Sequence, residues 1–351
     1  MSNRPFFAAR LETAFDRRME KAFRRAGWRA SVIGYTGYGT TEHIRVLARV
    51  LLTPGGRPTP RPQRDEAWRE RRGWRNGWVV SCVHRPARVT VGSVTVHVMT
   101  DRGGYIDVSV MDHGLKPGWH QITIDTQDER PAKARVLVLP DDVPFGLISD
   151  IDDTIIASYL PRPMVAAWNN LVLTEAARQS VPGMARLYRE VLHRHPGTPV
   201  FYVSTGPWNT FPFLDRFALR HGFPSGPMLL SDWGPTNTGW FRSGPEHKLR
   251  ALRSLARDFP RTQWLLVGDD GQHDPAIYAH FAAEFPDRVR AIAIRELNPV
   301  QQVLAHGTWR GLPEGTAPRR DGASTPEVRG PDGDELRSQL LPILDAWAAE
   351  N

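Results

Sequence analysis

An apolar run at residues 145–149 ends abruptly in the acidic stretch Asp150-Ile-Asp152-Asp153, which Thr154 follows. Such a run predicts a buried parallel strand with the charges at its C-terminal end. In open α/β sheets ligands bind at that end. A carboxylate there can attack phosphorus, and a second one can protonate the leaving oxygen. We therefore assign Asp150 as candidate nucleophile and Asp152 as candidate general acid and base, with a solvated acidic turn as the alternative.

After Pro140 the chain alternates short apolar runs with helical patterns. This alternation indicates a parallel sheet covered by helices on both faces. The predicted strands are 145–149, 200–203, 228–230, 264–267 and 289–294, and the predicted helices are 184–192, 214–219, 248–259 and 275–285.

Upstream of Pro140 the hydrophobic pattern has period two. Alternating runs separated by turn sequences predict a small antiparallel β-sandwich within residues 30–140, and a Pro- and Gly-rich insertion at 54–64 interrupts it. The predicted strands are 44–52, 88–91, 94–99, 105–110 and 121–124.

The two ends of the chain carry different patterns. Residues 310–333 are rich in Gly, Pro, Arg and Asp and are predicted to be disordered, before a terminal helix at 334–349. The chain thus divides into an N-terminal helix (1–29), the β-sandwich (30–140), a catalytic domain (141–308) and a flexible tail with the terminal helix (309–351).

The N-terminal segment reads as an amphipathic helix whose apolar residues recur every four positions. Basic residues flank this stripe, which suits a helix lying on an anionic membrane surface. Such a stripe more often packs against its own protein. The stripe consists of Phe7, Leu11, Phe15, Met19 and Phe23.

Three further places carry polar side chains just after a strand or at the start of a helix. The run at 200–203 ends in Ser204-Thr205-Gly206, which a simple Ser/Thr turn would also explain. Lys248 lies near the start of a predicted helix. A third hydrophobic run ends in carboxylates with the spacing Gly-Asp-x-x-x-x-Asp, formed by Gly268, Asp269 and Asp274, with Asp270 between them.

The four motifs, in this order, resemble those of the haloacid-dehalogenase phosphatase superfamily. The resemblance implies a Rossmann-like parallel sheet, hydrogen bonds from Ser204 and its turn to a phosphoryl oxygen, and Lys248 as the cation that neutralises nucleophile and phosphate. It also implies Mg²⁺ bound by Asp150, Asp269 and the backbone carbonyl of Asp152. Either Asp270 or Asp274 would support the metal.

The residues within and around the motifs resemble the catalytic domain of the actin-patch-type phosphatidate phosphatases. The similarity covers roughly residues 140–295 and includes Tyr202-Val-Ser-x-x-Pro-Trp and His247-Lys-Leu. It implies Mg²⁺-dependent conversion of phosphatidate to diacylglycerol. Asp270 stands where Ser is expected, and Thr205-Gly206 replaces another small polar pair, so the substrate stays open.

The spacing between motifs leaves no room for a full cap domain, which predicts an open site able to accept a phosphate on a large molecule. Aromatic residues in nearby loops either contact acyl chains or pack beneath the loops. They are Trp208, Trp233, Trp240 and Phe241. A phosphoprotein or polynucleotide-end phosphatase is the second hypothesis, and a non-catalytic lipid- or protein-binding module is the third.

Composition limits the cellular setting. Cys82 is the single cysteine, which favours a reducing cytoplasm. No apolar run is long enough to span a bilayer, and the N-terminus lacks the apolar core of a signal peptide. The net charge of +7 leans weakly toward polyanionic partners, with anionic lipid favoured over nucleic acid. We therefore predict a cytoplasmic protein and leave open its peripheral attachment to membranes.

Overall fold

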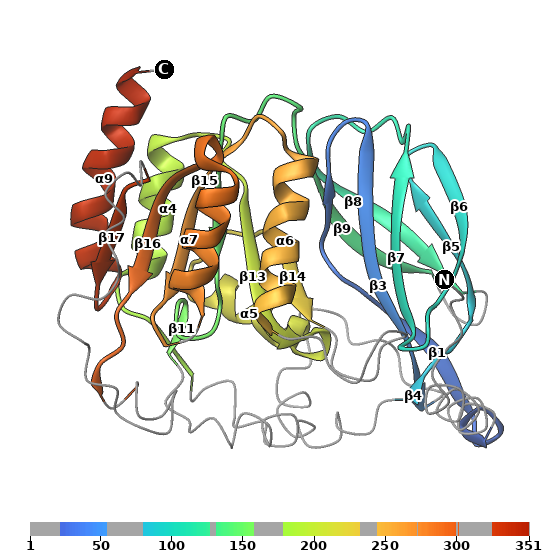
Figure 1. Cartoon of the computed structure of the whole chain (residues 1–351). Helices are drawn as coiled ribbons and strands as arrows, with labels where there is room; N and C mark the ends of the chain where they lie inside the picture. The colour runs from blue at the N-terminus through green and yellow to red at the C-terminus, as the bar shows by residue number, and fades with distance from the viewer. Residues whose placement is uncertain are drawn as a thin grey trace, which may run out of the picture. The chain divides into compact units, whose positions relative to one another are not determined.

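The computed structural model describes residues 22–54, 80–126, 131–157, 178–231, 244–271, 273–299, 301 and 325–350 (Figure 1). The described chain forms two compact units that divide between Asp141 and Asp142. The first unit contains a mostly antiparallel sheet, and the second contains a parallel sheet flanked by helices. The prediction of a mixed α/β chain with one sheet of each kind is confirmed.

The first unit is a nine-stranded sheet in the order β1-β3-β2-β9-β8-β5-β6, with β4 and β7 also paired to β3. All pairs are antiparallel except β2 with β9. The strands are β1 (Trp28–Gly34), β2 (Gly37–Gly39), β3 (His43–Pro54), β4 (Val80–Ser81), β5 (Pro86–Val91), β6 (Val94–Met99), β7 (Tyr105–Met111), β8 (Gly118–Asp125) and β9 (Ala132–Val138).

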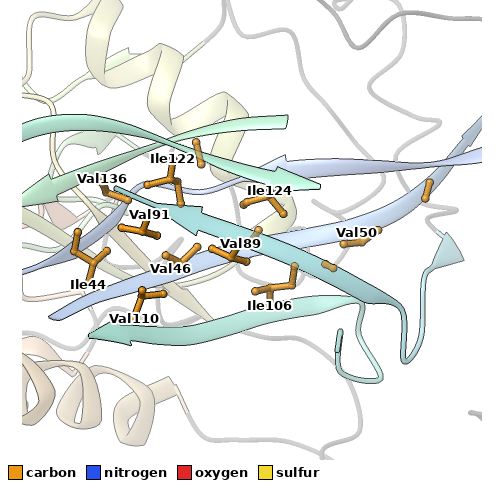
Figure 2. Packing of buried hydrophobic residues seen from close by; sticks show 14 of the residues in the cluster. Ile44, Val46, Val50, Val89, Val91, Ile106, Val110, Ile122, Ile124 and Val136 are labelled. Atoms are coloured by element: carbon orange, nitrogen blue, oxygen red, sulfur yellow. The ribbon is translucent and has the colours of Figure 1, made fainter. Parts of the chain in front are cut away.

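The core of this unit consists mostly of Val, Ile and Ala side chains. Figure 2 shows Val46 of β3 and Val110 of β7 lying near Val89 and Val91 of β5, with Ile122 of β8 close by. Alternation places every second residue in this core. The predicted antiparallel domain is therefore present. Its strands are hydrogen-bonded into a single sheet, because the short strand β2 links β3 to β9.

The predicted N-terminal helix lies largely outside the described residues, which contain only its last turn at 22–25. Phe23, the last residue of the apolar stripe, packs against the β core. Its ring centroid lies 4.5 Å from that of Trp28. This end of the stripe packs against its own protein.

The second unit is built on a six-stranded sheet in the order β14-β13-β10-β15-β16-β17, parallel throughout. From β10 the chain moves outward through β13 to β14, and then returns to β15 on the other side. The carboxyl end of β10 is thus the topological switch point, where ligands bind in such sheets. The strands are β10 (Phe145–Ser149), β13 (Val200–Pro207), β14 (Met228–Ser231), β15 (Gln263–Asp269), β16 (Val289–Arg295) and β17 (Glu327–Gly330).

Helices cover both faces of the parallel sheet (Figure 1). Helix α4 packs against α9, which also contacts β16 and β17, whereas α6 packs against α7 and contacts β13. The helices are α4 (Met184–Arg194), α5 (Phe211–Arg220), α6 (Gly244–Asp258), α7 (Asp274–Glu284) and α9 (Gly333–Glu350), with short 3₁₀ turns η3 (Trp208–Thr210) and η4 (Pro286–Arg288). A two-stranded ribbon of β11 (Ile156–Ala157) and β12 (Gln179–Ser180) follows β10.

The prediction of disorder across 310–333 is wrong for its C-terminal part. Residues 327–330 form β17, which pairs in parallel with β16 at the margin of the sheet. Gly333 begins α9, which covers β16 and β17. The sequence pattern did not predict β17, because the strand has only four residues and its pairing partner β16 lies more than thirty residues upstream.

Candidate active site

Asp150 lies at the carboxyl end of the central strand. Its backbone N–H donates to the carbonyl of Val267 over 2.8 Å, which continues the pairing of β10 with β15. The side chain is only 2% exposed. Its Oδ2 accepts a 3.3 Å hydrogen bond from Thr154 Oγ1. The chain then turns sharply at Asp153, whose φ of 57° lies in the left-handed region, so the loop folds back over the strand end.

Lys248 lies on α6 and reaches the same carboxylate. Its Nζ is 2.7 Å from Asp150 Oδ1 and 2.5 Å from Asp274 Oδ1. The side chain is 3% exposed. A buried ammonium with two carboxylates at hydrogen-bond distance is held in one position. The structure therefore brings the predicted cation and the predicted nucleophile into direct contact.

The electrostatics of this cluster follow from its burial. Burial raises the pKa of Asp150 to about 7, although the charge of Lys248 opposes the rise. Burial also raises the pKa of Asp269 well above its usual value, and the charge of Asp274 adds to the shift. Burial lowers the pKa of Lys248, but Asp150 and Asp274 more than offset this effect and raise it. Lys248 is thus charged at neutral pH.

Three carboxylates converge at the strand ends. Ligand atoms of Asp150, Asp269 and Asp274 all lie within 4.8 Å of one another. The buried oxygens Asp269 Oδ2 and Asp274 Oδ2 have no hydrogen-bond partner. Unpaired buried carboxylate oxygens are costly unless a cation binds them, and oxygen ligands are those that Mg²⁺ prefers. These three residues therefore fit a divalent metal ion.

The turn after β15 is shaped to bring Asp274 close. A Cβ on Gly268 would lie 2.5 Å from Asp274 Oδ2, so only glycine leaves room for that carboxylate. The backbone N–H of Gly271 donates to Asp269 Oδ1 over 2.7 Å and orients it. Asp270 points elsewhere, since its Oδ1 accepts a 2.8 Å hydrogen bond from the N–H of Leu297. Of the two supporting acids predicted, the structure places Asp274 in the cluster.

Ser204 lies within β13, directly after the apolar residues 200–203, and contacts Asp152. Its Oγ donates to Asp152 Oδ2 over 3.0 Å and accepts a 2.9 Å bond from the N–H of Gly206. The hydroxyl predicted to face a phosphoryl oxygen thus orients Asp152 here. Thr205 and Gly206 are half-buried beside it, and Ser231 Oγ donates to the Thr205 carbonyl over 2.5 Å.

Sequence reasoning missed Arg295, the last residue of β16. Its guanidinium is 5% exposed and donates to the carbonyl of Asp153 over 2.6 Å, to that of Pro331 over 3.1 Å and to Gln301 Oε1 over 3.0 Å. It thereby fixes the turn that follows Asp150. Arg295 directly follows the predicted parallel strand 289–294, and this position at the carboxyl end of a strand could have identified it as a candidate site residue.

The aromatic residues proposed near the site divide into two groups. Trp208 is 8% exposed, so it packs within the protein. Trp233, Trp240 and Phe241 lie outside the described residues.

Residues 145–296 match the family model described as "Phosphatidate phosphatase APP1, catalytic domain". Phosphatidate phosphatase APP1 of Saccharomyces cerevisiae is 32% identical over 184 residues, which are 51% of this chain and 31% of that protein. An uncharacterised protein of Schizosaccharomyces pombe is 26% identical over 209 residues, which are 58% of this chain and 34% of that protein. The chain spans about a third of the length of these two relatives.

Among solved structures, a carbohydrate acetylesterase of Xanthomonas citri aligns with 65% of this chain and 68% of its own. The identity is 11% and the TM-score 0.24, so this likeness bears on neither fold nor function. The matched residues 145–296 include every residue of the acidic cluster and Lys248.

Proposed function

We propose that this chain, which carries an APP1-type phosphatidate phosphatase catalytic domain, is a Mg²⁺-dependent phosphatase that hydrolyses phosphatidate or a related phospholipid monoester. The observation that carries the proposal is the meeting of Asp150, Asp274 and Lys248 within the matched segment, at the switch point of the parallel sheet. We assign the second unit to the haloacid-dehalogenase fold, in its form without a cap.

In the proposed first step, a carboxylate oxygen of Asp150 attacks phosphorus. The bond between that oxygen and phosphorus forms as the bond from phosphorus to the diacylglycerol oxygen breaks. Asp152 gives its proton to the leaving oxygen. Lys248 favours the ionised form of Asp150, because its charge opposes the rise in pKa that burial causes.

In the second step, Asp152 acts as the base. It takes a proton from water, whose oxygen attacks phosphorus and breaks the bond to Asp150, so inorganic phosphate leaves and both carboxyls regain their starting forms. The hydrogen bond from Ser204 holds Asp152 toward the site in both steps. Mg²⁺ held by Asp150, Asp269 and Asp274 would supply positive charge that reduces repulsion between the nucleophile and the phosphate.

A comparison between phosphate esters tests which substrate class the protein hydrolyses. Phosphate release is measured in parallel from several esters, with MgCl₂ or with EDTA. The esters are phosphatidate in mixed micelles, phosphatidate in vesicles, a phosphopeptide and a 3′-phosphorylated oligonucleotide. We expect release from phosphatidate that EDTA abolishes and that Asp150→Asn lacks. Faster release from the peptide or the oligonucleotide would replace the lipid by that substrate class. Absence of release from every ester would leave a binding module.

The proposed lipid substrate lies in a membrane, which the protein would reach from the aqueous side. In the part of the chain that the structure describes, no helix is both long and apolar enough to cross a bilayer. The comparison of micelles with vesicles therefore also measures how well the protein extracts its substrate from a packed surface.

A further inference from the structure

The proposed active site has a buried side and an accessible side. Asp150, Lys248 and the two further metal-fitting acids are buried, whereas Asp152, Thr205 and Gly206 are half-buried. A phosphate ester must approach from the half-buried side. That approach brings a dianion toward carboxylates, and Lys248 already contacts Asp150 and Asp274. A cation on the accessible side would lower the cost of this approach.

Arg178 is placed on that side by the ribbon that follows the nucleophile. It precedes β12, whose Gln179 pairs with Ala157 of β11. The same ribbon is joined to the site because Ile156 forms a bridge with Asp152. Val181 extends this anchoring, since its N–H donates to the Ile155 carbonyl over 3.1 Å.

The guanidinium of Arg178 lies over an aromatic ring. Its Cζ is 4.6 Å from the centroid of Phe213, in the first turn of α5, the helix that follows β13 and η3. Both side chains are half-buried. This cation–π contact holds the guanidinium beside α5, and a guanidinium carries the N–H donors that suit two oxygens of one phosphate.

Arg178 also lies within electrostatic reach of Asp152. Burial lowers the pKa of the guanidinium to about 10, and the charge of Asp152 acts in the opposite direction. Arg178 therefore carries its charge at neutral pH, within the electrostatic influence of the acid that would protonate the leaving oxygen. Neither the sequence motifs nor the carboxylate cluster includes this residue.

We propose that Arg178 binds the non-bridging oxygens of the substrate phosphoryl group, opposite Lys248. This inference rests on the proposed function, because it gives a role to a residue of the same site. Phe213 holds the guanidinium through the cation–π contact, and the β11–β12 ribbon ties Arg178 to the segment that carries Asp152. Arg178 is thus a substrate-binding residue, and it is not needed to hold Asp150.

The test is calorimetric binding of inorganic phosphate to the full chain in MgCl₂, which requires no turnover. Arg178→Ala should weaken phosphate binding by about 10- to 100-fold, the range for a charge-assisted hydrogen-bonded pair. Arg178→Lys should restore part of the affinity, and Phe213→Leu should weaken binding less than the alanine variant. Arg186→Ala removes an exposed arginine of α4 and is the matched control, which should bind as the wild type does.

Steady-state kinetics with p-nitrophenyl phosphate as the substrate provide a second test. Arg178→Ala should raise KM far more than it lowers kcat. If the alanine variant does not fold, Arg178→Gln carries the same expectation. If a folded Arg178 variant binds phosphate as tightly as the wild type does, the inference is overturned, even if the enzyme hydrolyses phosphatidate. It is also overturned if the wild type binds no phosphate at millimolar concentrations. Arginine-dependent phosphate binding without hydrolysis supports the inference and contradicts the proposed function.

Discussion

Ser204 Oγ donates a 3.0 Å hydrogen bond to Asp152 Oδ2, although the two residues lie 52 positions apart in the chain. The bond joins the loop after β10 to the neighbouring strand β13. Ser204 is itself fixed by the N–H of Gly206. The proposed acid and base is therefore oriented by a neighbouring strand, and its position depends on the pairing of β10 with β13.

Ser204→Ala should slow turnover by about 10- to 100-fold, since Asp152 would lose its orienting donor while remaining present. The loss in unfolding free energy should be only about 1 kcal/mol, the usual net value of one hydrogen bond. Phosphate release and urea unfolding measure the two effects. Ser338→Ala removes an exposed hydroxyl of α9 and serves as the control. Equal activity in the two serine variants would show that Ser204 does not orient Asp152.

Asp150→Asn should abolish hydrolysis, with a fall of at least about 10³-fold, because an amide does not attack phosphorus as a carboxylate does. The fold should persist, since the amide has the same shape. Circular dichroism and the melting temperature check the fold, and phosphate release checks activity. Asp152→Asn should also lose turnover but should accumulate phosphorylated enzyme, because hydrolysis needs the base. Substantial activity in folded Asp150→Asn protein would exclude the aspartyl-phosphate mechanism.

The metal-free protein should lose stability as the pH rises from about 4 to about 7. The pKa of Asp150 is about 7 in the folded protein, against an ordinary value of 3.8. Between these values the folded state holds a proton that the unfolded state has released, so the free energy of unfolding falls with increasing pH. Burial shifts the pKa of Asp269 in the same direction. Above pH 7 this contribution should level off.

Urea unfolding in EDTA across that window measures the effect, and Asp269→Asn separates it from other carboxyls. In the Asp269→Asn variant, the free energy of unfolding should fall less steeply with pH than it does in the wild type. MgCl₂ should also flatten the wild-type profile, because a cation binds the ionised carboxylates of the folded state. A wild-type profile that Asp269→Asn leaves unchanged would show that the cluster does not control stability in this range.

Lys248→Ala should destabilise the fold by about 3–5 kcal/mol near neutral pH, since it leaves Asp150 and Asp274 buried without their shared cation. The loss should be smaller under mildly acidic conditions, where the pKa of Asp150 lets that carboxyl take up a proton and lose its charge. Lys133→Ala, at an exposed position of β9, is the control. A loss that does not depend on pH would point to packing, and not charge, as the role of Lys248.

Much of the second unit could be predicted because its signals are local. The strand at 145–149 was predicted with the bounds observed, and the acids follow it directly. Ser204 and Asp269 likewise end apolar runs whose length and composition indicate buried strands. The carboxyl ends of parallel strands meet at one edge, so the meeting of Asp150 with Asp269 followed from topology alone.

The parts that could not be predicted depend on distant contacts. Asp270 and Asp274 follow the same strand, and the hydrogen bond that turns Asp270 away comes from Leu297, on the loop after β16. The role of Arg295 depends on carbonyls of the nucleophile turn and of the loop after β17. The link through β2 that joins the first sheet is only three residues long and carries no period-two pattern of its own.

The position of β17 and α9 matters for anyone who shortens this chain. The family match stops at residue 296, yet the strand that pairs with β16 and the helix that covers it come from residues 327–350. A protein cut at the end of the match would expose the backbone of Ile292 and Ile294 along an open edge and remove the ion pairs that join α4 to α9. Such edges recruit strands from other copies. The smallest piece that stays monodisperse in expression should therefore retain the C-terminal helix, although the family match does not include it.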